Sequence, residues 1–569
     1  MLQMARPEVF YTYEWALAVD RAYRASMPRL LFLAYEDDSL VGVIALATDS
    51  LRRRAFFLAY TTADYCDFLC APRYHLEFMD AVFAELRRLN LANLQLANLP
   101  ADSLTATALG DVAARHRYSV FSQPAYRCAQ VVLSSPERRE SVLQMVQGNR
   151  KLARSFKVMA KTAPVTLRHL RSWEQIESAF PRFAEAHVAR FLATGRISNL
   201  ARPERRVFLA ELARLLSVPG WVALSHLLIG DQPVAWNYGF QFAGSWFWYQ
   251  PTFDSRWQLH SPGLCLLWKI VEEACENPEI NLVDLGLGAE GYKEQIATGE
   301  RRTLYITASR SLLVSVKEAA RYHTAELVKS VPRLESSVRR ALHSLSSLRS
   351  SPQAGGSSSV SGRLVRSCVR ELLDRREIFF FESPQNGEVA AELLEQHSLS
   401  LQPVNLETLA VIAMDTDDQE TLAYLLRAAG RLRAKFGQAF ALVAEGGMPI
   451  HLCWVADFND FHMSELDHKL VAPSLDSVLL FDCFTPRSAR GRGYYGMAVS
   501  AVAAQLRAAG KRPWIFSSIT NVSSLRGIEK TRFVRRFSLC RSRVLFMDAS
   551  VRSRLLITAE PLSEVSSAG

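Results

Sequence analysis

The sequence lacks the marks of membrane-spanning and secreted proteins. No apolar run reaches the ~20 residues that a transmembrane helix needs, and residues 1–8 lack the basic-then-apolar order of a signal peptide. The 9 cysteines are an odd number without a Cys-x-x-Cys spacing, which favours reduced thiols over a disulfide framework. We therefore expect a cytoplasmic protein without a transmembrane segment.

Metal-binding patterns are scarce as well. Cys66 and Cys70 lie close in the sequence, but no histidine cluster accompanies them. Two partly buried thiols are the simpler interpretation, and no metal site is predicted.

A large excess of one charge is also absent. A net charge of +10 over 569 residues is modest, and 49% hydrophobic with 22% charged residues is ordinary for a globular protein. This balance suits an anionic ligand, an acidic polysaccharide or nucleic acid. The arginines are nevertheless scattered through predicted helices. Solvated helix faces are therefore the simpler interpretation, and nucleic acid is not an expected partner.

A chain of 569 residues is too long for one core, and three or four domains are expected. The clearest boundary is the Gly/Ser-rich segment 350–362, which cannot bury enough apolar surface to order itself. The predicted order is an α/β unit at 1–140, a second at 141–330, a helical then Ser/Gly-rich flexible linker at 331–365, a third α/β unit at 366–555 and a tail at 556–569. Residues 141–160 are predicted to form one basic helix.

The most informative segment, residues 258–293, has the pattern of loop, helix, strand and loop. Ser261 is suited to cap the helix, Pro262 to its first turn and Gly263 to a close backbone approach. A short apolar strand follows at 281–285, and several polar residues lie at or beyond its carboxyl end: Asp284, Glu290, Tyr292 and Lys293. Because ligands bind at the carboxyl ends of strands in open α/β sheets, we expect a site there.

A glycine-rich loop marks the third unit. An apolar strand at 477–484 runs into the segment 485–496, and a helix follows at once. Glycines let consecutive N–H groups turn inward at a helix N-terminus, which favours phosphate binding, and Arg490 and Arg492 add positive charge. The alternative is a glycine-rich turn without a ligand. The order of strand, loop and helix favours the phosphate site.

Roughly the first 330 residues resemble the CelD-type acetyltransferases (cellulose biosynthesis) of the GNAT superfamily. The segment 258–293 carries this resemblance together with the alternating residues 221–253, the basic run 149–154, and the spaced residues Phe183, His187, Arg190, Gly195 and Ser198. The resemblance implies an α/β fold with mixed sheets. It also implies two acyltransferase units in tandem, as in the FemAB-type peptidyltransferases.

Residues 375–550 resemble a further GNAT unit, which makes three in all. Its acetyl-CoA loop has the pattern Arg/Gln-x-x-Gly-x-Gly/Ala; Arg490 and Gly493 match it, while Tyr495 occupies the place of the last small residue and Gly496 follows one place late. The resemblance implies that the diphosphate of an acyl-CoA is bound by Arg490, Gly491, Arg492, Gly493, Tyr495 and Gly496.

A later GNAT motif is also similar. Asn521 and Ser524 match residues that contact the cofactor, and Lys530 belongs to the segment that closes the unit. Arg532 replaces the usual glycine, and Ile528 stands where many members carry the tyrosine that protonates the departing thiolate. Either Tyr494 or Tyr495 supplies that proton, or the unit binds without catalysing.

Acyl transfer from a thioester to an amine needs a base for the amine, an oxyanion stabiliser and a proton for the thiolate. In the second unit, Asp284 and Glu290 are the candidate bases, and Asp482 is the candidate base of the third unit. Cofactor contacts of the second unit are assigned to Ser261, Gly263 and Lys293. The alternatives are a surface pair between Glu290 and Lys293 and a turn cap by Asp284.

Candidate acceptor contacts in the second unit come from a helix, a turn and a strand. His187 and Arg190 lie one turn apart on a helix, and His260 precedes the turn at Ser261. Trp248 belongs to an aromatic strand and offers a face for a sugar ring. For Trp248 the competing explanation is packing in the core. For His187 the competing explanation is a structural role within the helix.

The sequence therefore predicts an acyl-CoA-dependent N-acyltransferase with acetyl-CoA or another acyl-CoA as co-substrate. The acceptor would be a small-molecule or saccharide amine, such as an amino sugar of polysaccharide or cell-envelope biosynthesis. Two alternatives stay open: a FemAB-like transferase that uses aminoacyl-tRNA, and a non-catalytic acyl-CoA-binding sensor or scaffold.

Overall fold

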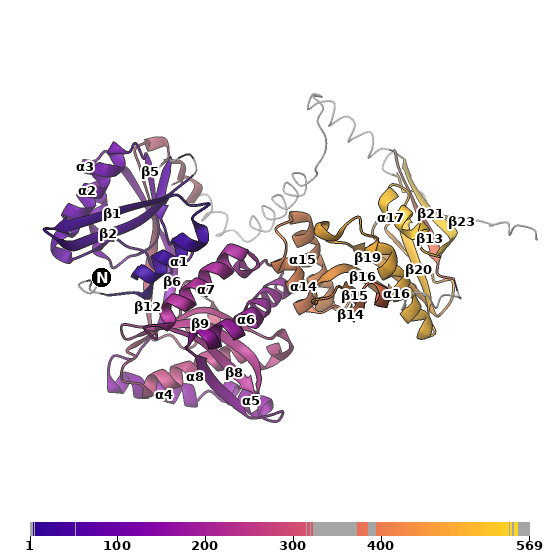
Figure 1. Cartoon of the computed structure of the whole chain (residues 1–569), viewed down its shortest axis with the longest axis horizontal. Helices are drawn as coiled ribbons and strands as arrows, with labels where there is room; N and C mark the ends of the chain where they lie inside the picture. Colours follow the sequence, from indigo (N-terminus) through magenta and orange to yellow (C-terminus); the bar gives the residue numbers. More distant parts are fainter. Residues whose placement is uncertain are drawn as a thin grey trace, which may run out of the picture. The chain divides into compact units, whose positions relative to one another are not determined.

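The described residues fall into two compact bodies in the computed structural model. The model describes residues 4–322, apart from 5, 50, 52, 289, 315 and 319, and residues 373–555, apart from 385–393, 545–546 and 549–550. Residues up to 190 and 202–322 form a tandem body, and residues 191–201 and 373–555 form a C-terminal body (Figure 1). The predicted linker at 350–362 and the predicted tail at 556–569 lie outside the described residues.

The tandem body is built on one mixed sheet, whose described strands run in the order β1-β2-β3-β5-β12-β6-β11-β10-β9-β8-β7 with β4 beside β2. Its first half contains β1 (Arg29–Glu36), β2 (Ser39–Thr48), β3 (Arg54–Phe57), β4 (Leu69–Cys70), β5 (Asn93–Pro100) and β6 (Ser119–Val132). The helices of this half are α1 (Tyr13–Tyr23), α2 (His75–Arg88) and α3 (Leu104–Arg115).

The second half of the tandem body adds strands β7 (Val165–Leu170), β8 (Val222–Ile229), β9 (Gln232–Phe242), β10 (Ser245–Phe253), β11 (Leu282–Asp284) and β12 (Gly299–Ser309). Its helices are α4 (Pro136–Gln147), α5 (Arg150–Met159), α6 (Trp173–Ala193), α7 (Pro203–Ser217), α8 (Pro262–Glu276), α9 (Gly291–Glu294) and the 3-10 helix η4 (Ser255–His260).

Two long strands exchange between the halves and join them into one sheet. Strand β6 leaves the first half and pairs with β11, with Gln130 opposite Asp284. Strand β12 returns from the second half and pairs with β5, with Ser309 opposite Asn93. The two exchanged strands also pair with each other, so side chains of both halves meet along them.

The C-terminal body has a sheet of its own, in the order β14-β15-β16-β19-β20-β13-β21-β22 with β23 beside β21. Its strands are β13 (Leu373–Glu382), β14 (Ser400–Pro403), β15 (Gln438–Val443), β16 (Pro449–Asp457), β19 (Ser477–Phe484), β20 (Arg512–Ser518), β21 (Val534–Val544), β22 (Met547–Asp548) and β23 (Arg552–Leu555); β17 (His462–Met463) and β18 (His468–Lys469) pair separately. Its helices are α14 (Leu406–Met414), α15 (Gln419–Ala434), α16 (Tyr494–Ala508) and α17 (Val522–Glu529).

The second half of the tandem body and the C-terminal body repeat one topology. The order β7-β8-β9-β10-β11-β6-β12 corresponds strand by strand to β14-β15-β16-β19-β20-β13-β21. Each contains one parallel pair, β10 with β11 and β19 with β20, and a helix connects the two strands of each pair. The predicted fold class of mixed α/β sheets is confirmed, and the shared strand order agrees with the prediction that the second and third units are of the same kind.

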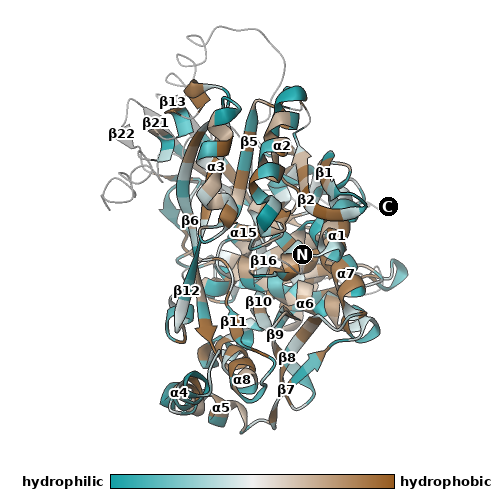
Figure 2. Ribbon diagram, turned by 90° about the vertical axis from the view of Figure 1, so that its left-hand side faces the viewer, coloured by the Kyte–Doolittle hydropathy of each residue, from teal (hydrophilic) through white to brown (hydrophobic). Residues whose placement is uncertain are grey.

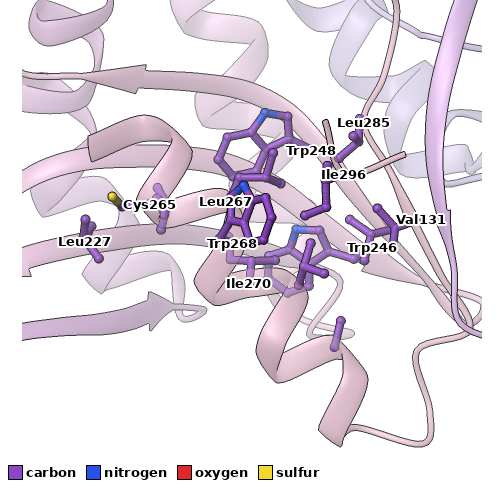
Figure 3. Packing of buried hydrophobic residues seen from close by; sticks show 14 of the residues in the cluster. Val131, Leu227, Trp246, Trp248, Cys265, Leu267, Trp268, Ile270, Leu285 and Ile296 are labelled. Carbon is purple, nitrogen blue, oxygen red and sulfur yellow. The ribbon is translucent and has the colours of Figure 1, made fainter. Parts of the chain in front are cut away.

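Apolar side chains of α8 pack on the sheet of the second half. Trp246 and Trp248 of β10 contact a buried cluster with Trp268 of α8, and this cluster fills the space between helix and sheet (Figure 3). Helix α4, at the edge of this half, is largely hydrophilic (Figure 2). The core therefore fixes where α8 begins relative to the end of β10.

The prediction of one helix over residues 141–160 is wrong, because two helices cover this range. Helix α4 ends at Gln147, and the Asn149 side chain accepts a hydrogen bond from the Leu152 amide at 3.1 Å, which caps α5. An asparagine that caps a helix has non-helical backbone angles, so it starts a new helix and interrupts the old one. No described helix is long and apolar enough to cross a bilayer.

Candidate functional site

The parallel strands β10 and β11 separate at their carboxyl ends. They pair only from Ser245 opposite Leu282 to Phe247 opposite Asp284. Strand β10 continues to Phe253, and its register with β9 shifts between Phe247 and Gln250. The backbone of β10 beyond Phe247 thus has no partner strand on the β11 side, and this is the position where such sheets bind ligands.

Asp284, one predicted base, lies in the junction between the two halves with 1% of its surface exposed. Its Oδ2 accepts hydrogen bonds from Tyr65 Oη at 2.8 Å, from Gln130 Nε2 at 2.7 Å and from Arg6 Nη2 at 3.2 Å. Its Oδ1 accepts from the Gly286 amide at 2.9 Å. Four donors thus hold this carboxylate, and three of them come from the first half, so Asp284 ties β11 to that half.

A residue that the sequence did not single out, Asp64 of the first half, lies at the exit of β11. A methyl group built on Gly286 would stand 2.8 Å from Asp64 Oδ2 and 3.3 Å from the Trp248 carbonyl oxygen, so this carboxyl and the end of β10 both border Gly286. Burial and, to a smaller extent, the charge of Asp284 raise the pKa of Asp64 to about 7, against the opposing influence of Lys293. A carboxyl with a pKa near 7 is matched to proton transfer at neutral pH.

Glu290 and Lys293 form the pair that the sequence analysis gave as an alternative. Lys293 Nζ lies 2.8 Å from Glu290 Oε2, with 5% of the lysine side chain and 57% of the glutamate side chain exposed. The same ammonium donates to the Leu287 carbonyl at 2.9 Å. The buried lysine therefore holds the loop after β11 closed, and its contacts leave it turned toward the protein and away from a phosphate in solvent.

A second buried ion cluster lies nearby and joins the N-terminal segment to β12. Glu8, with 0% exposure, contacts Arg301 at 2.6 Å and Arg6 at 2.8 Å. Burial raises the pKa of Glu8 to about 7, although both arginines lower it. Arg6 reaches Asp284 as well, so the two clusters are connected.

The predicted acceptor contacts on α6 lie at the end of β10. Arg190 Nη1 donates to the Pro251 carbonyl at 3.0 Å, and its guanidinium lies over the Phe253 ring. His187 is buried, and burial with the charge of Arg190 lowers its pKa to about 3, so the imidazole is neutral. Both side chains brace the strand that carries the site.

The prediction that Trp248 stacks on a sugar ring is wrong, because this side chain is 3% exposed and packs in the core beneath α8 (Figure 3). Its Nε1 donates to Tyr292 Oη at 3.4 Å, which connects β10 to α9. His260 is half-buried at the end of η4, where its carbonyl accepts from Cys265 Sγ at 3.7 Å.

The start of α8 differs from the predicted capped form. Ser261 has a left-handed backbone with φ of 49°, and its side chain makes no cap hydrogen bond, so the predicted cap is wrong. Its carbonyl accepts from the Leu264 and Cys265 amides at 3.0 and 3.1 Å instead. Pro262 has no N–H, so among the described residues the amide of Gly263 is the first open donor of the helix.

Gly263 is required by the aromatic side chain below it. A Cβ at this position would stand 3.2 Å from Phe253 Cδ1. The expected close approach therefore involves the last residue of β10, and it brings the start of α8 onto the end of that strand.

The glycine-rich loop of the C-terminal body is more open. Gly491 and Gly493 have φ of 82° and 80°, with nothing within 4 Å of a Cβ built on either. Within the part of the chain that the structure describes, the amides of 491–496 have no backbone acceptor. This run of amides before α16 has the form of an anion cradle. Arg490 is engaged beside it, 2.7 Å from Glu420 and 3.0 Å from the Thr485 carbonyl.

Tyr495 fills the space between α16 and α17. A Cβ on Gly527 would stand 2.6 Å from Tyr495 Cδ1, and the tyrosine Oη lies 3.0 Å from Ser524 Oγ. Burial raises the pKa of Tyr495 above its ordinary value. Asn521 caps α17 by accepting from the Ser524 amide at 3.2 Å, so both predicted cofactor contacts have protein partners.

The remaining predicted residues of this body are spread around the loop. Asp482 has a left-handed φ of 44° and pairs with Arg431. Tyr494 packs against a small apolar cluster at the start of α16, and Lys530 is exposed at the end of α17.

Comparisons with known proteins agree with this architecture. The family model described as "Acetyltransferase (GNAT) domain" matches residues 147–294, which include β10, α8 and β11. This part of the chain is similar to a GNAT-type acetyltransferase domain, and the predicted resemblance to the GNAT superfamily is confirmed over it. No curated protein matches the chain.

Solved structures with a similar backbone include FemX, at 7% identity and a TM-score of 0.39 over 53% of this chain and 92% of that one. A tandem GNAT protein from the clavulanic acid biosynthesis pathway has 11% identity and a TM-score of 0.32 over 54% of this chain and 91% of its own. L-PGS from Bacillus licheniformis has 10% identity and a TM-score of 0.35 over 55% of this chain and 96% of its own. Similarities this low say nothing of the substrates.

Metal ligands are not gathered anywhere in the described ranges. No group of three or more His, Cys, Asp or Glu side chains there is arranged to hold an ion. Cys66 and Cys70 are both buried free thiols.

Proposed function

We propose that this chain is an acyl-CoA-dependent N-acyltransferase whose reaction takes place at the carboxyl ends of β10 and β11. The observation that carries the proposal is Asp64, whose carboxyl lies against Gly286 at the exit of β11 and has a pKa raised to about 7. The GNAT-type domain over residues 147–294 supports the class of reaction.

In this proposal the residues bind, orient and deprotonate, because acyl transfer needs little covalent help from the protein. The amine nitrogen attacks the thioester carbonyl carbon, the carbon–sulfur bond breaks, and the thiolate leaves and takes a proton from solvent. Asp64 accepts the proton that the amine loses. Asp284 and Lys293 hold the strand and loop against which Asp64 lies. The resemblance to CelD-type enzymes favours an amino sugar as acceptor.

Thiol release from acetyl-CoA in the presence of amino sugars and other amines tests the proposal. The wild-type chain is expected to release free thiol only when an amine is present, and Asp64→Asn is expected to lose that turnover while it remains folded. Asp67→Asn is a matched control. The neighbouring Asp67 carboxyl is also buried, and that burial raises its pKa to about 6. It differs from Asp64 because it accepts a hydrogen bond from the Phe68 amide at 2.8 Å and lies away from the exit of β11. Equal turnover by wild type and Asp64→Asn would exclude Asp64 as the base.

For the C-terminal body we propose binding of an anionic carrier without catalysis. The open amides of 491–496 favour binding, while Tyr495 packed on α17 and Asp482 paired with Arg431 do not favour turnover. Thermal unfolding of the full chain with and without acetyl-CoA tests this role. Arg492→Glu, beside the cradle, is expected to remove part of the stabilisation by acetyl-CoA and to leave thiol release unchanged. Loss of turnover in this variant would place catalysis in the C-terminal body instead.

A further inference from the structure

A groove of about 440 Å³ runs between α5 and α8 in the second half of the tandem body. Its walls are mainly apolar and aromatic and include Leu152, Phe156 and Trp268. Three charged side chains also line it: Lys157, Lys269 and Glu272. This volume falls in the range of small-molecule sites, which combine apolar walls with a few polar groups.

The α5 wall of the groove carries an unbalanced positive charge. Residues 149–161 contain five cations and no acidic residue, and all five side chains are exposed: Arg150, Lys151, Arg154, Lys157 and Lys161. None of the five forms an ion pair with another described residue. On the opposite wall Lys269 is paired, with its Nζ 2.6 Å from Glu272 and 5.6 Å from the centre of the Phe156 ring. The groove is therefore complementary to a ligand that is both aromatic and anionic.

The groove follows the second half of α8 at Trp268, Lys269 and Glu272, and its α5 wall leads toward the start of that helix. Helix α5 contacts η4, the turn that leads into α8. The rise of a helix places Lys269 about 9 Å along the axis from Gly263, whose amide is the open donor of this helix. A nucleotide diphosphate spans a distance of this order, so one ligand reaches both places.

We infer that this groove binds the 3′-phosphoadenosine end of the thioester carrier. The adenine ring lies against Phe156, and the 3′-phosphate meets the cations of α5, of which Lys157 lines the groove. This inference rests on the proposed function, since it assigns the nucleotide part of the same co-substrate. The 3′-phosphate is the group that separates such a carrier from ordinary adenine nucleotides.

Calorimetric titration of the full chain with adenosine 3′,5′-bisphosphate and with 5′-ADP tests the inference. The bisphosphate is expected to bind more tightly than 5′-ADP, and more weakly as salt rises. The double charge reversal Arg154→Glu with Lys157→Glu is expected to weaken bisphosphate binding about tenfold or more and to raise the KM for acetyl-CoA with kcat unchanged. Arg182→Glu on α6, which reverses the charge of another exposed arginine away from the groove, is the matched control and is expected to change neither quantity.

Three results would overturn the inference. The first is that wild type and the double variant both turn over acetyl-CoA with the same bisphosphate affinity and the same KM for acetyl-CoA. This result would overturn the groove assignment but would leave the proposed function unaffected. The second is equal affinity for the bisphosphate and 5′-ADP. The third is binding of anionic phospholipid vesicles or of tRNA that the double variant abolishes and the bisphosphate does not displace. Retained, variant-sensitive bisphosphate binding without thiol release from any amine would instead support the groove and count against the proposed reaction.

Discussion

At the scale of single residues, burial decides which acidic and aromatic groups are available for chemistry. Asp284 is the residue that the sequence motif points to, yet four donors hold it in place. Asp64 has no motif of its own, but burial and the neighbouring Asp284 raise its pKa to about 7. Whether a carboxyl can act as a base therefore depends on its surroundings in the fold, and not on its position in a sequence motif.

Replacement of Asp64 by asparagine is expected to lower kcat/KM about 10²- to 10⁴-fold, the usual contribution of a general base. Because a base acts only when it is deprotonated, kcat/KM of the wild type is expected to rise with pH up to about 7 and then level off. The variant loses this limb of the pH profile. Thiol release measured from pH 5 to 9 checks both expectations, and an unchanged limb in Asp64→Asn would assign it to another group.

Replacement of Trp248 by alanine is expected to destabilise the tandem body by about 3 to 5 kcal/mol, because a large buried side chain is removed from the cluster beneath α8. Urea unfolding of the full chain measures this loss, and Trp248→Phe, which keeps most of the packing, serves as the control. A stable Trp248→Ala variant with only a raised KM for the acceptor would restore the predicted stacking role.

At the scale of elements, the loop after β11 is held by a lysine and not by its glycines alone. Lys293 reaches back to the Leu287 carbonyl and to Glu290, so the short helix α9 closes onto the strand it follows. The loop in turn supports Gly286, against which Asp64 lies. The position of the proposed base thus depends on an element from the other half of the body.

Substitution of Lys293 by methionine is expected to cost about 1 to 3 kcal/mol, because the buried Leu287 carbonyl loses its donor. Substitution of the exposed partner, Glu290→Gln, is expected to cost less than about 1 kcal/mol, since an exposed ion pair contributes little. Chemical denaturation of the two variants side by side measures the asymmetry. Equal losses would show that the ion pair, and not the carbonyl contact, holds the loop.

Several elements were predictable from local pattern alone. The strand predicted at 477–484 has the same bounds in the structure, because a continuous run of buried apolar residues identifies it. The helix predicted at 141–160 was wrong because a single side chain, Asn149, caps α5. Helix α16 begins at Tyr494, three residues before the predicted start at Met497, since Gly493 with its left-handed backbone marks the start.

At the scale of the whole tandem body, carboxyl groups with raised pKa values collect where the two halves meet. Burial raises the pKa of Glu8 and Asp64 to about 7 and that of Asp67 to about 6. In the folded body these groups keep protons that the unfolded chain has already released. Burial acts in the opposite sense on His187 and His226, whose pKa values fall to about 3 and about 4.

The sign of the pH dependence follows from these directions. The three carboxyls contribute stability below the unfolded carboxyl pKa values of 4.5 and 3.8, and that contribution is lost as the pH rises to about 7. The two histidines oppose this loss only below their ordinary value of 6.5. The tandem body is therefore expected to lose stability most steeply between about pH 6.5 and 7, and its stability is expected to level off above that range.

Thermal unfolding of the full chain across this range checks the expectation, with Asp64→Asn as the comparison. Asparagine does not ionise, so the variant is expected to gain stability relative to the wild type as the pH rises. A constant difference between the two proteins from pH 5 to 8 would contradict the raised pKa of Asp64.

The sequence by itself determined the class of the fold, several elements of the second and third units and the segment at the end of β11, because alternation, turn residues and helix-start residues act over short distances. Tertiary structure alone decided that Asp64 lies beside Gly286, that Trp248 is core, and that α5 and α8 enclose a groove. The exchange of β6 and β12 brings distant residues together, and burial then sets their charge. Neither the pairing of distant strands nor the burial of a carboxyl can be derived from residues that are neighbours in the sequence.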